Sequence, residues 1–204
     1  MTFYYCSVVF WSIAYILLTI YMTKTKNIGI PVIAMLGNFA WELNAVIHSS
    51  LDVSILWQGG TVWAFFDFFV IYAYLKNCIH TNKRKRITIF FIFQLLYFGL
   101  MYIVFELGYQ FPADFLIDFI MASAFLLYLI DRKIVPNDLA VAIGVSKLLG
   151  DFAAWICGWN LGSFNEITIF LIGSCSTTYD MIYLVLLIYQ NKEYRKKEAV
   201  KKAL

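Results

Sequence analysis

Five acidic side chains interrupt the long apolar stretches of this sequence: Glu42, Asp67, Asp118, Asp151 and Asp180. An ionised group inside a membrane is costly unless it is paired or hydrated, so each of these acids is a candidate functional group. Counted from the expected ends of the stretches at about 1.5 Å per helical residue, the first four lie roughly 10 Å below one membrane surface. Their common depth predicts a shared polar cavity, with Asp180 lying deeper as its floor.

Helical spacing gives two of these acids a polar neighbour. Lys147 and Asp151 are four residues apart, on one helix face, where they can neutralise each other. A buried ion pair that only holds a bundle together would have the same spacing. Asn38 precedes Glu42 by four residues, so an amide and a carboxyl share a face. For Asp67, simple helix packing stays open beside a functional role.

Three tryptophans accompany the acids. Trp41 directly precedes the acid of its stretch, Trp63 precedes Asp67 by four residues, and Trp155 follows Asp151 by four. An aromatic belt at the membrane surface would also explain these tryptophans. Rings beside acids suit a different chemistry, because an aromatic face stabilises a desolvated cation by about 2 kcal/mol and a carboxylic acid in an apolar site keeps its proton until a substrate demands it. Together they predict a general acid and a cation-stabilising pocket.

Seven apolar runs must position these groups. Each run has about the 20 residues that a transmembrane helix needs, and a composition of 62% hydrophobic and 14% charged residues excludes a soluble domain. We predict an all-α membrane protein, a seven-transmembrane-helix bundle over residues 1–191 with a basic tail over residues 192–204. Short connections favour antiparallel packing of neighbours along the chain. The runs cover residues 3–22, 28–48, 59–76, 87–107, 111–130, 137–158 and 165–190.

The basic residues predict the orientation of the bundle. Fifteen of the sixteen Lys and Arg residues follow the first, third, fifth or seventh run, and the sixteenth is Lys147. By the positive-inside rule, the N-terminus lies outside and the C-terminus in the cytoplasm. Lys201 and Lys202 near the end of the chain have the form of a retrieval signal, which would place the protein in the endoplasmic reticulum of a eukaryote. A bacterial host would place it in the plasma membrane.

Several segments resemble one family, the small seven-helix transmembrane terpene cyclases of fungal meroterpenoid and indole-diterpene pathways. Asn38-Phe39-Ala40-Trp41-Glu42 is similar to the family's asparagine-x-x-tryptophan-glutamate segment, and Trp63 with Asp67 is similar to its tryptophan-x-x-x-aspartate segment. Residues 146–150 resemble a further helix-six segment, with Lys147 where arginine is common. Residues 179–183 resemble the aspartate-x-x-tyrosine segment of helix seven.

The resemblance implies a function and two acids that perform it. Glu42 and Asp180 correspond to the acids associated with cyclisation. The implied reaction is protonation of an epoxide or terminal alkene on a lipophilic prenylated substrate, a cation cascade and loss of a proton, with no metal or organic cofactor. Besides the substrate we expect membrane lipid, and no nucleic acid, as a partner. The supporting residues that we expect are Asn38, Trp41, Trp63, Asp67, Asp118, Lys147, Asp151 and Trp155.

Three other functions stay open. Intramembrane carboxylates also relay protons in transporters for small or proton-coupled solutes, although the internal repeats common in transporters are absent from the sequence. A retinal photoreceptor would need Lys147 as its Schiff-base lysine. A non-enzymatic scaffold predicts acids paired in a dry core, whereas an enzyme predicts a cavity lined by Glu42, Asp67, Asp118 and Asp180.

Overall fold

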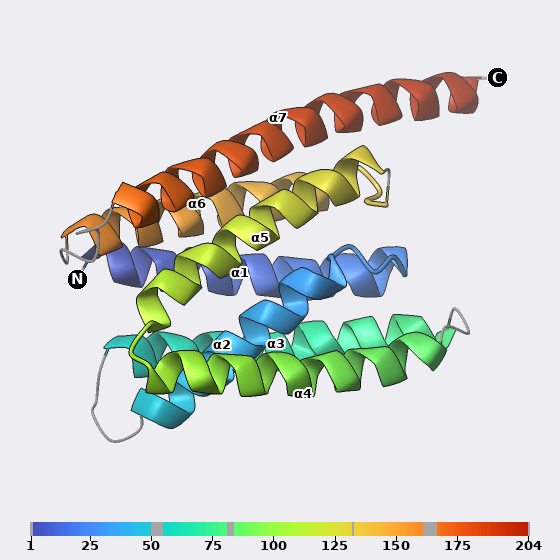
Figure 1. Cartoon of the computed structure of the whole chain (residues 1–204). Coiled ribbons are helices and arrows are strands. Elements are labelled where there is room, and N and C mark those ends of the chain that lie inside the picture. Colours follow the sequence, from blue (N-terminus) through green and yellow to red (C-terminus); the bar gives the residue numbers. More distant parts are fainter. Residues whose placement is uncertain (1, 50–54, 81–83, 132, 161–166, 204) are drawn as a thin grey trace.

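A computed structural model describes residues 2–49, 55–80, 84–131, 133–160 and 167–203, which form seven α-helices and no strand (Figure 1). The predicted all-α class is confirmed, and every predicted run coincides with a helix. The largest difference is at the end of the chain, where the basic segment continues the last helix. The helices are α1 (Thr2–Thr25), α2 (Val32–Ser49), α3 (Ile55–His80), α4 (Arg84–Glu106), α5 (Gln110–Ile130), α6 (Asp138–Asn160) and α7 (Ile167–Ala203).

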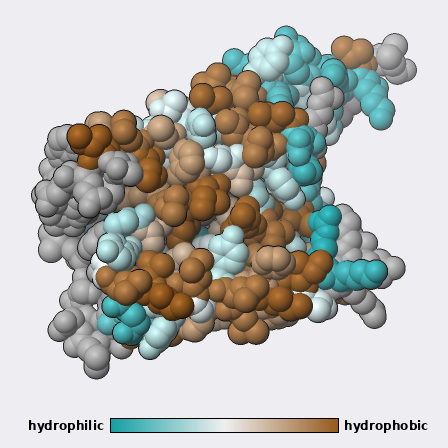
Figure 2. All heavy atoms as spheres, viewed as in Figure 1, coloured by the Kyte–Doolittle hydropathy of each residue, from teal (hydrophilic) through white to brown (hydrophobic). Residues whose placement is uncertain are grey.

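The helices have the length and the exterior of a membrane domain. Six of the seven are long and apolar enough to cross a bilayer. The other, α2, has 18 residues, and at 1.5 Å per residue it is about 27 Å long, close to the thickness of the hydrocarbon core. Large apolar side chains such as Leu95 and Leu96 on α4 are exposed. Figure 2 shows apolar residues in a broad band across the face, with hydrophilic residues gathered toward the end where α7 terminates.

Successive helices run in opposite directions. The C-terminal ends of α1, α3, α5 and α7 lie at one end of the bundle, and the start of α1 lies at the other (Figure 1). Described basic residues near these helix ends, such as Lys24, Lys76 and Lys133, therefore lie at the same end of the bundle. That this end faces the cytoplasm stays a prediction.

The packing differs from a simple bundle of chain neighbours, because α1 is central. It packs chiefly against α6 and α3, while α5 packs against α7. The reason is a stripe of buried residues along α1 at helical spacing, which needs partners on more than one side. Contact with α6 is close at Gly150, where an added Cβ would lie 2.7 Å from Cδ1 of Trp11. The buried residues of α1 are Tyr4, Ser7, Trp11, Ala14, Tyr15, Leu18, Tyr21 and Met22.

Polar contacts fix the end of α1 to two other segments. The Tyr21 hydroxyl accepts a hydrogen bond from the backbone N–H of Val135 at 2.8 Å and donates to the carbonyl of the same residue at 3.2 Å. The Asn77 side chain of α3 donates to the carbonyl of Met22 at 3.0 Å. The α1–α2 connection, the α5–α6 connection and the end of α3 are thereby held together.

Candidate active site

The first of two polar clusters joins three helices around the carboxyl of Glu42. The Tyr15 hydroxyl of α1 donates to Glu42 Oε1 at 2.7 Å, and the Asn38 amide of α2 donates to the same oxygen at 2.7 Å. Asn38 Nδ2 also lies 3.2 Å from Oδ2 of Asp67 on α3. Glu42 and Asp67 are only 1% and 2% exposed. The predicted pairing of Asn38 with Glu42 is present, and Asp67 joins it.

This arrangement favours a carboxyl pair that holds a proton. Glu42 and Asp67 share the Asn38 amide, whose nitrogen lies 2.7 Å from Glu42 Oε1 and 3.2 Å from Asp67 Oδ2. Two carboxylates this close in an apolar interior would repel each other, whereas a single proton between them removes one charge and supplies a hydrogen bond. The cluster can therefore deliver a proton to a group that enters beside it.

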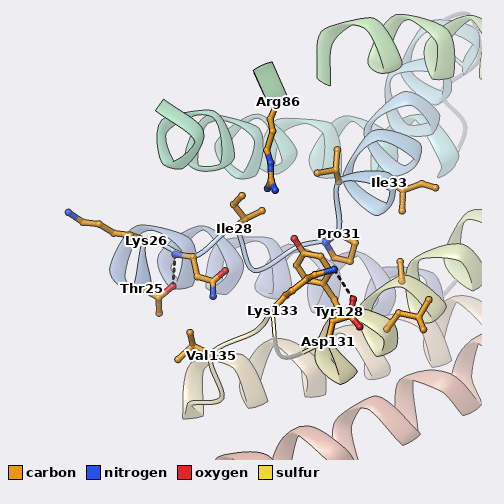
Figure 3. Close-up of a pocket in the computed structure, with 14 residues that line it drawn as sticks. Thr25, Lys26, Ile28, Pro31, Ile33, Arg86, Tyr128, Asp131, Lys133 and Val135 are labelled. Atoms are coloured by element: carbon orange, nitrogen blue, oxygen red, sulfur yellow. Dashed lines mark hydrogen bonds and ion pairs between the residues drawn. The ribbon is translucent and has the colours of Figure 1, made fainter. Parts of the chain in front are cut away.

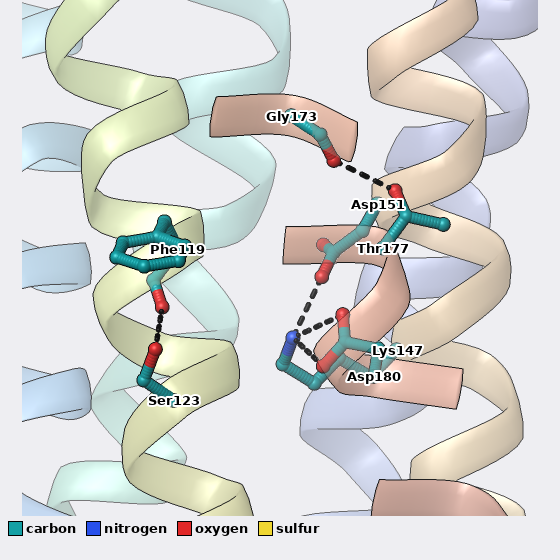
Figure 4. A network of polar contacts seen from close by, with 7 residues as sticks. All are labelled: Phe119, Ser123, Lys147, Asp151, Gly173, Thr177 and Asp180. Atoms are coloured by element: carbon teal, nitrogen blue, oxygen red, sulfur yellow. Dashed lines mark hydrogen bonds and ion pairs between the residues drawn. The ribbon is translucent and has the colours of Figure 1, made fainter. Parts of the chain in front are cut away.

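The second cluster surrounds the ammonium of Lys147 on α6 (Figure 4). Its Nζ donates to Asp151 Oδ2 at 2.6 Å and to Asp180 Oδ1 and Oδ2 at 2.7 Å each. All three residues are at most 4% exposed. The predicted pairing of Lys147 with Asp151 is present. Asp180 of α7 is a second carboxyl group on the same ammonium, so one cation serves two buried acids.

A further acid of α5 lies near this second cluster. Asp118 is 9% exposed and interacts electrostatically with Lys147 and Asp180. One turn before it, the half-buried Asp114 lines the same cavity as Asp118. Across the described residues, no group of three or more His, Cys, Asp or Glu side chains is arranged to hold a metal ion.

Two aromatic residues of α1 lie between the clusters. The rings of Trp11 and Tyr15 are 5.4 Å apart, centroid to centroid. The Tyr15 hydroxyl reaches Glu42, as described above, while Lys147 Nζ lies 5.5 Å from the Trp11 ring. The Phe125 ring of α5 is 6.0 Å from the same ammonium. The interior thus already holds one cation near two aromatic rings.

The structure divides the expected common cavity in two. One cavity of about 20 Å³ is lined by Asp118 and one of about 20 Å³ by Asp67, and Trp11, Tyr15 and Asn38 line both. The expectation of one open space is therefore wrong, because the two α1 rings fill its centre. Each cavity has room for about one water molecule, far less than the several hundred Å³ that enclose a typical organic ligand.

The three predicted tryptophans occupy different environments. Trp41 and Trp63 line the cavity that contains Asp118, and their rings lie beside other aromatic residues, Phe105 and Tyr4 respectively. Trp155 lines neither cavity. Its ring packs between α6 and α7, 5.7 Å from the ring of Phe170 and against Gly173.

The interpretation of the sequence missed two residues of this site and dismissed a third. Trp11 and Tyr15 lie in the first apolar run, which contains no acid, and the candidate residues were identified by their spacing from acids. Their signal is the spacing of large aromatic and small residues along one face of that run, which marks a buried helix. Asp114 is the fourth residue of its apolar run, a position at which a solvated residue near the interface is expected, but it is half-buried and lines the same cavity as Asp118.

Comparison with known proteins matches the part of the chain that contains the first cluster. A family model described as Pyr4-like transmembrane terpene cyclases matches residues 1–130. A terpene cyclase, ascF of Acremonium egyptiacum, is 32% identical over 70 residues, which cover 33% of this chain and 24% of that protein. The chain therefore aligns with only about a quarter of this relative. No solved structure matches.

Proposed function

The chain belongs to the family of Pyr4-like transmembrane terpene cyclases, and on this premise we propose that it cyclises a lipophilic prenylated substrate by acid-initiated isomerisation within the membrane. The observation that carries the proposal is the Glu42 cluster, a buried carboxyl pair with fixed donors beside two aromatic cavities. The integral, multi-pass character of the protein follows from the family and from its six candidate spans.

Glu42 is the proton donor in this proposal. Tyr15 and Asn38 both donate to Oε1, so the hydrogen bonds of that oxygen are already made and the proton resides on Oε2. Transfer to an epoxide oxygen or a terminal alkene carbon leaves a carboxylate on Glu42, and the two donors on Oε1 stabilise its new charge. The substrate gains the proton and develops a carbocation.

Asp180 acts as a fixed negative charge near the cation. Lys147 can balance only one of the two acids that it contacts, so ionisation of both Asp151 and Asp180 gives the triad one excess negative charge. In a site of low polarity, that charge stabilises positive charge that develops nearby. Asp180 is thus a partner of the cation, while Glu42 supplies the proton.

The aromatic rings supply the surface over which the cation moves. The faces of Trp11 and Phe125 already contact one cation, the ammonium of Lys147, at 5.5 and 6.0 Å. A carbocation has no hydrogen-bond donors, so the ring faces and the excess carboxylate charge are the stabilising groups available to it. Successive ring closures end when a C–H proton returns to a carboxylate, so the product has the mass of the substrate.

The substrate must displace side chains to enter. Its prenyl chain cannot fit two cavities of about 20 Å³ each, so the Trp11 and Tyr15 rings have to move apart from their present contact. Such opening would move the buried face of α1 away from α6 or α3, the helices against which it chiefly packs. In the closed arrangement the acid pair is shielded from bulk water, and a bound substrate would then provide that shield.

An assay with membranes that contain the protein tests the proposal. Epoxidised and plain prenylated phenols are supplied. The products are separated by chromatography, and their molecular masses are determined by mass spectrometry. We expect a product of unchanged mass and new retention time, which Glu42→Gln abolishes and Asp180→Asn reduces. Glu106→Gln is the matched control, because Glu106 is exposed at the end of α4 and the change is chemically the same.

Full conversion by the Glu42→Gln variant would refute this assignment of the acid. The transporter interpretation has its own measurement, uptake of a solute into proteoliposomes that depends on a pH gradient. Conversion of substrate in detergent, where no gradient exists, supports the cyclase instead.

A further inference from the structure

A groove of about 860 Å³ lies at the end of the bundle where α1 terminates, away from both polar clusters (Figure 3). Three segments form it: the α1–α2 connection, the start of α4, and the end of α5 with the connection that follows. Its lining is mainly apolar, with Ile28, Pro31 and Val32 on one side and Ala124 and Leu127 on the other.

Basic side chains from all three segments line this groove. Arg86 extends from α4 toward Ile28 and Tyr128, and the ammonium of Lys133 lies beside the Tyr128 ring (Figure 3). Lys26 also lines the groove, but its ammonium extends away from Arg86 and Lys133 (Figure 3). Among the described residues of the lining the one acid is Asp131, which accepts a hydrogen bond from Lys133 at 2.7 Å. Arg86, Lys133 and Asp131 together carry a net charge of +1.

The groove opens sideways, toward the surface that faces lipid. Ile33 and Leu127 line it and are 45% and 62% exposed, as are many apolar side chains of the membrane-facing surface. An apolar wall that continues onto the outer surface is accessible to a hydrocarbon chain from the bilayer. A basic end beside such a wall matches a molecule with a negative head and an apolar tail.

We propose that this groove binds an anionic membrane phospholipid, with its phosphate between Arg86 and Lys133 and an acyl chain along Val32 and Ala124. A guanidinium binds a phosphate in a bidentate manner, and an ammonium that uses one donor for Asp131 keeps two more for the phosphate oxygens. Anionic lipids are concentrated in the cytoplasmic leaflet, the side on which the charge pattern places this end of the bundle. The site is independent of the proposed cyclisation.

Lipid binding to the full chain tests the proposal. The protein is purified in detergent and titrated with phosphatidylglycerol or with phosphatidylcholine of the same acyl chains, and bound lipid is counted by native mass spectrometry. Both basic residues are exposed, so Arg86→Gln with Lys133→Gln leaves the helices intact, which an unchanged melting temperature verifies. The matched control is Lys192→Gln with Lys201→Gln, an equal loss of charge on exposed positions of α7.

We expect tighter binding of phosphatidylglycerol than of phosphatidylcholine, and a loss of about 30-fold in the Arg86 and Lys133 double variant. Ala124→Phe, which fills the apolar part and keeps the charges, should weaken both lipids. Equal binding of the two lipids, or equal loss in the control, would overturn the proposal. Displacement of phosphatidylglycerol by millimolar inorganic phosphate would also overturn it, because the site would then recognise a free anion.

Discussion

The hydroxyl of Tyr15 donates a hydrogen bond to Oε1 of Glu42 at 2.7 Å, although 27 residues separate them along the chain. The contact ties the central helix α1 to the acid of α2 and fixes the orientation of the carboxyl. Because Asn38 donates to the same oxygen, the carboxyl has one oxygen held by two donors, while Oε2 is buried without a hydrogen-bond partner among the described residues. The position of the acid therefore depends on a helix that contributes no acid of its own.

Tyr15→Phe tests whether this hydroxyl positions the acid. The ring stays, so packing against Trp11 is kept, and only the donor to Glu42 is lost. We expect kcat to fall about 100-fold with little change in KM, because a small misplacement of the acid affects the reaction more than binding. Steady-state kinetics in detergent separate the two constants. Tyr189→Phe, an exposed position on α7, is the control. A raised KM with normal kcat would mean that Tyr15 only binds substrate.

The ion triad predicts a large loss of stability from a single substitution. Lys147→Met leaves the carboxylates of Asp151 and Asp180 buried without their cation, which typically costs about 3–5 kcal/mol. A thermal melt in detergent should show a markedly lower midpoint, whereas Lys147→Arg should stay near the original. Adding Asp151→Asn and Asp180→Asn to Lys147→Met should restore the midpoint without restoring cyclisation. A restored enzyme would show that the triad serves folding alone.

The close packing of Gly150 against Trp11 predicts that one added methyl group at position 150 destabilises the protein. An added Cβ would lie 2.7 Å from Trp11 Cδ1, so Gly150→Ala forces α1 and α6 apart or rotates the Trp11 ring, at a typical cost of about 1–3 kcal/mol. Gly99→Ala is the matched control, because an added Cβ there meets open space. Unfolding should shift for the first variant only, and Trp11→Leu combined with Gly150→Ala should recover part of the loss. An equal shift in both variants would contradict the close contact.

The orientation of the chain is open to a direct test. In a background without the four native cysteines, Thr2→Cys and Lys201→Cys place one label site at each end of the bundle. In sealed cells we expect a membrane-impermeant maleimide to modify the cysteine at position 2 and to spare the one at position 201 until the membrane is opened. The reverse pattern would place the basic residues outside, against the positive-inside rule.

The sequence predicted those features that depend on local spacing. The helices follow from runs of about 20 apolar residues, and the contacts of Asn38 with Glu42 and of Lys147 with Asp151 follow from four-residue spacing on one helix. Long-range packing could not be read this way. The second carboxylate on Lys147 comes from α7, 33 residues further on, and depends on how α6 and α7 are rotated about their axes.

The centre of the site was hidden for a related reason. Trp11 and Tyr15 carry no charge, and within a uniformly apolar run an inward-facing aromatic residue resembles one that faces lipid. The spacing along one face hints at burial, but which helices cover that face depends on the tertiary arrangement, in which α1 packs chiefly against α6 and α3. The same two rings explain why the expected single cavity is divided.

The central place of α1 has a consequence for biogenesis. During translation α1 leaves the ribosome long before α6, yet α1 packs chiefly against α6, with Trp11 in close contact with Gly150. Until residues 138–160 have entered the bilayer, the Trp11 ring lacks its packing partner on α6, whereas the Tyr15 hydroxyl can already reach Glu42 of α2. Assembly of the Lys147 cluster is thus a late event that needs α6 and α7, and a ribosome stalled between α5 and α6 would hold a chain that can form the Glu42 cluster but not the second one.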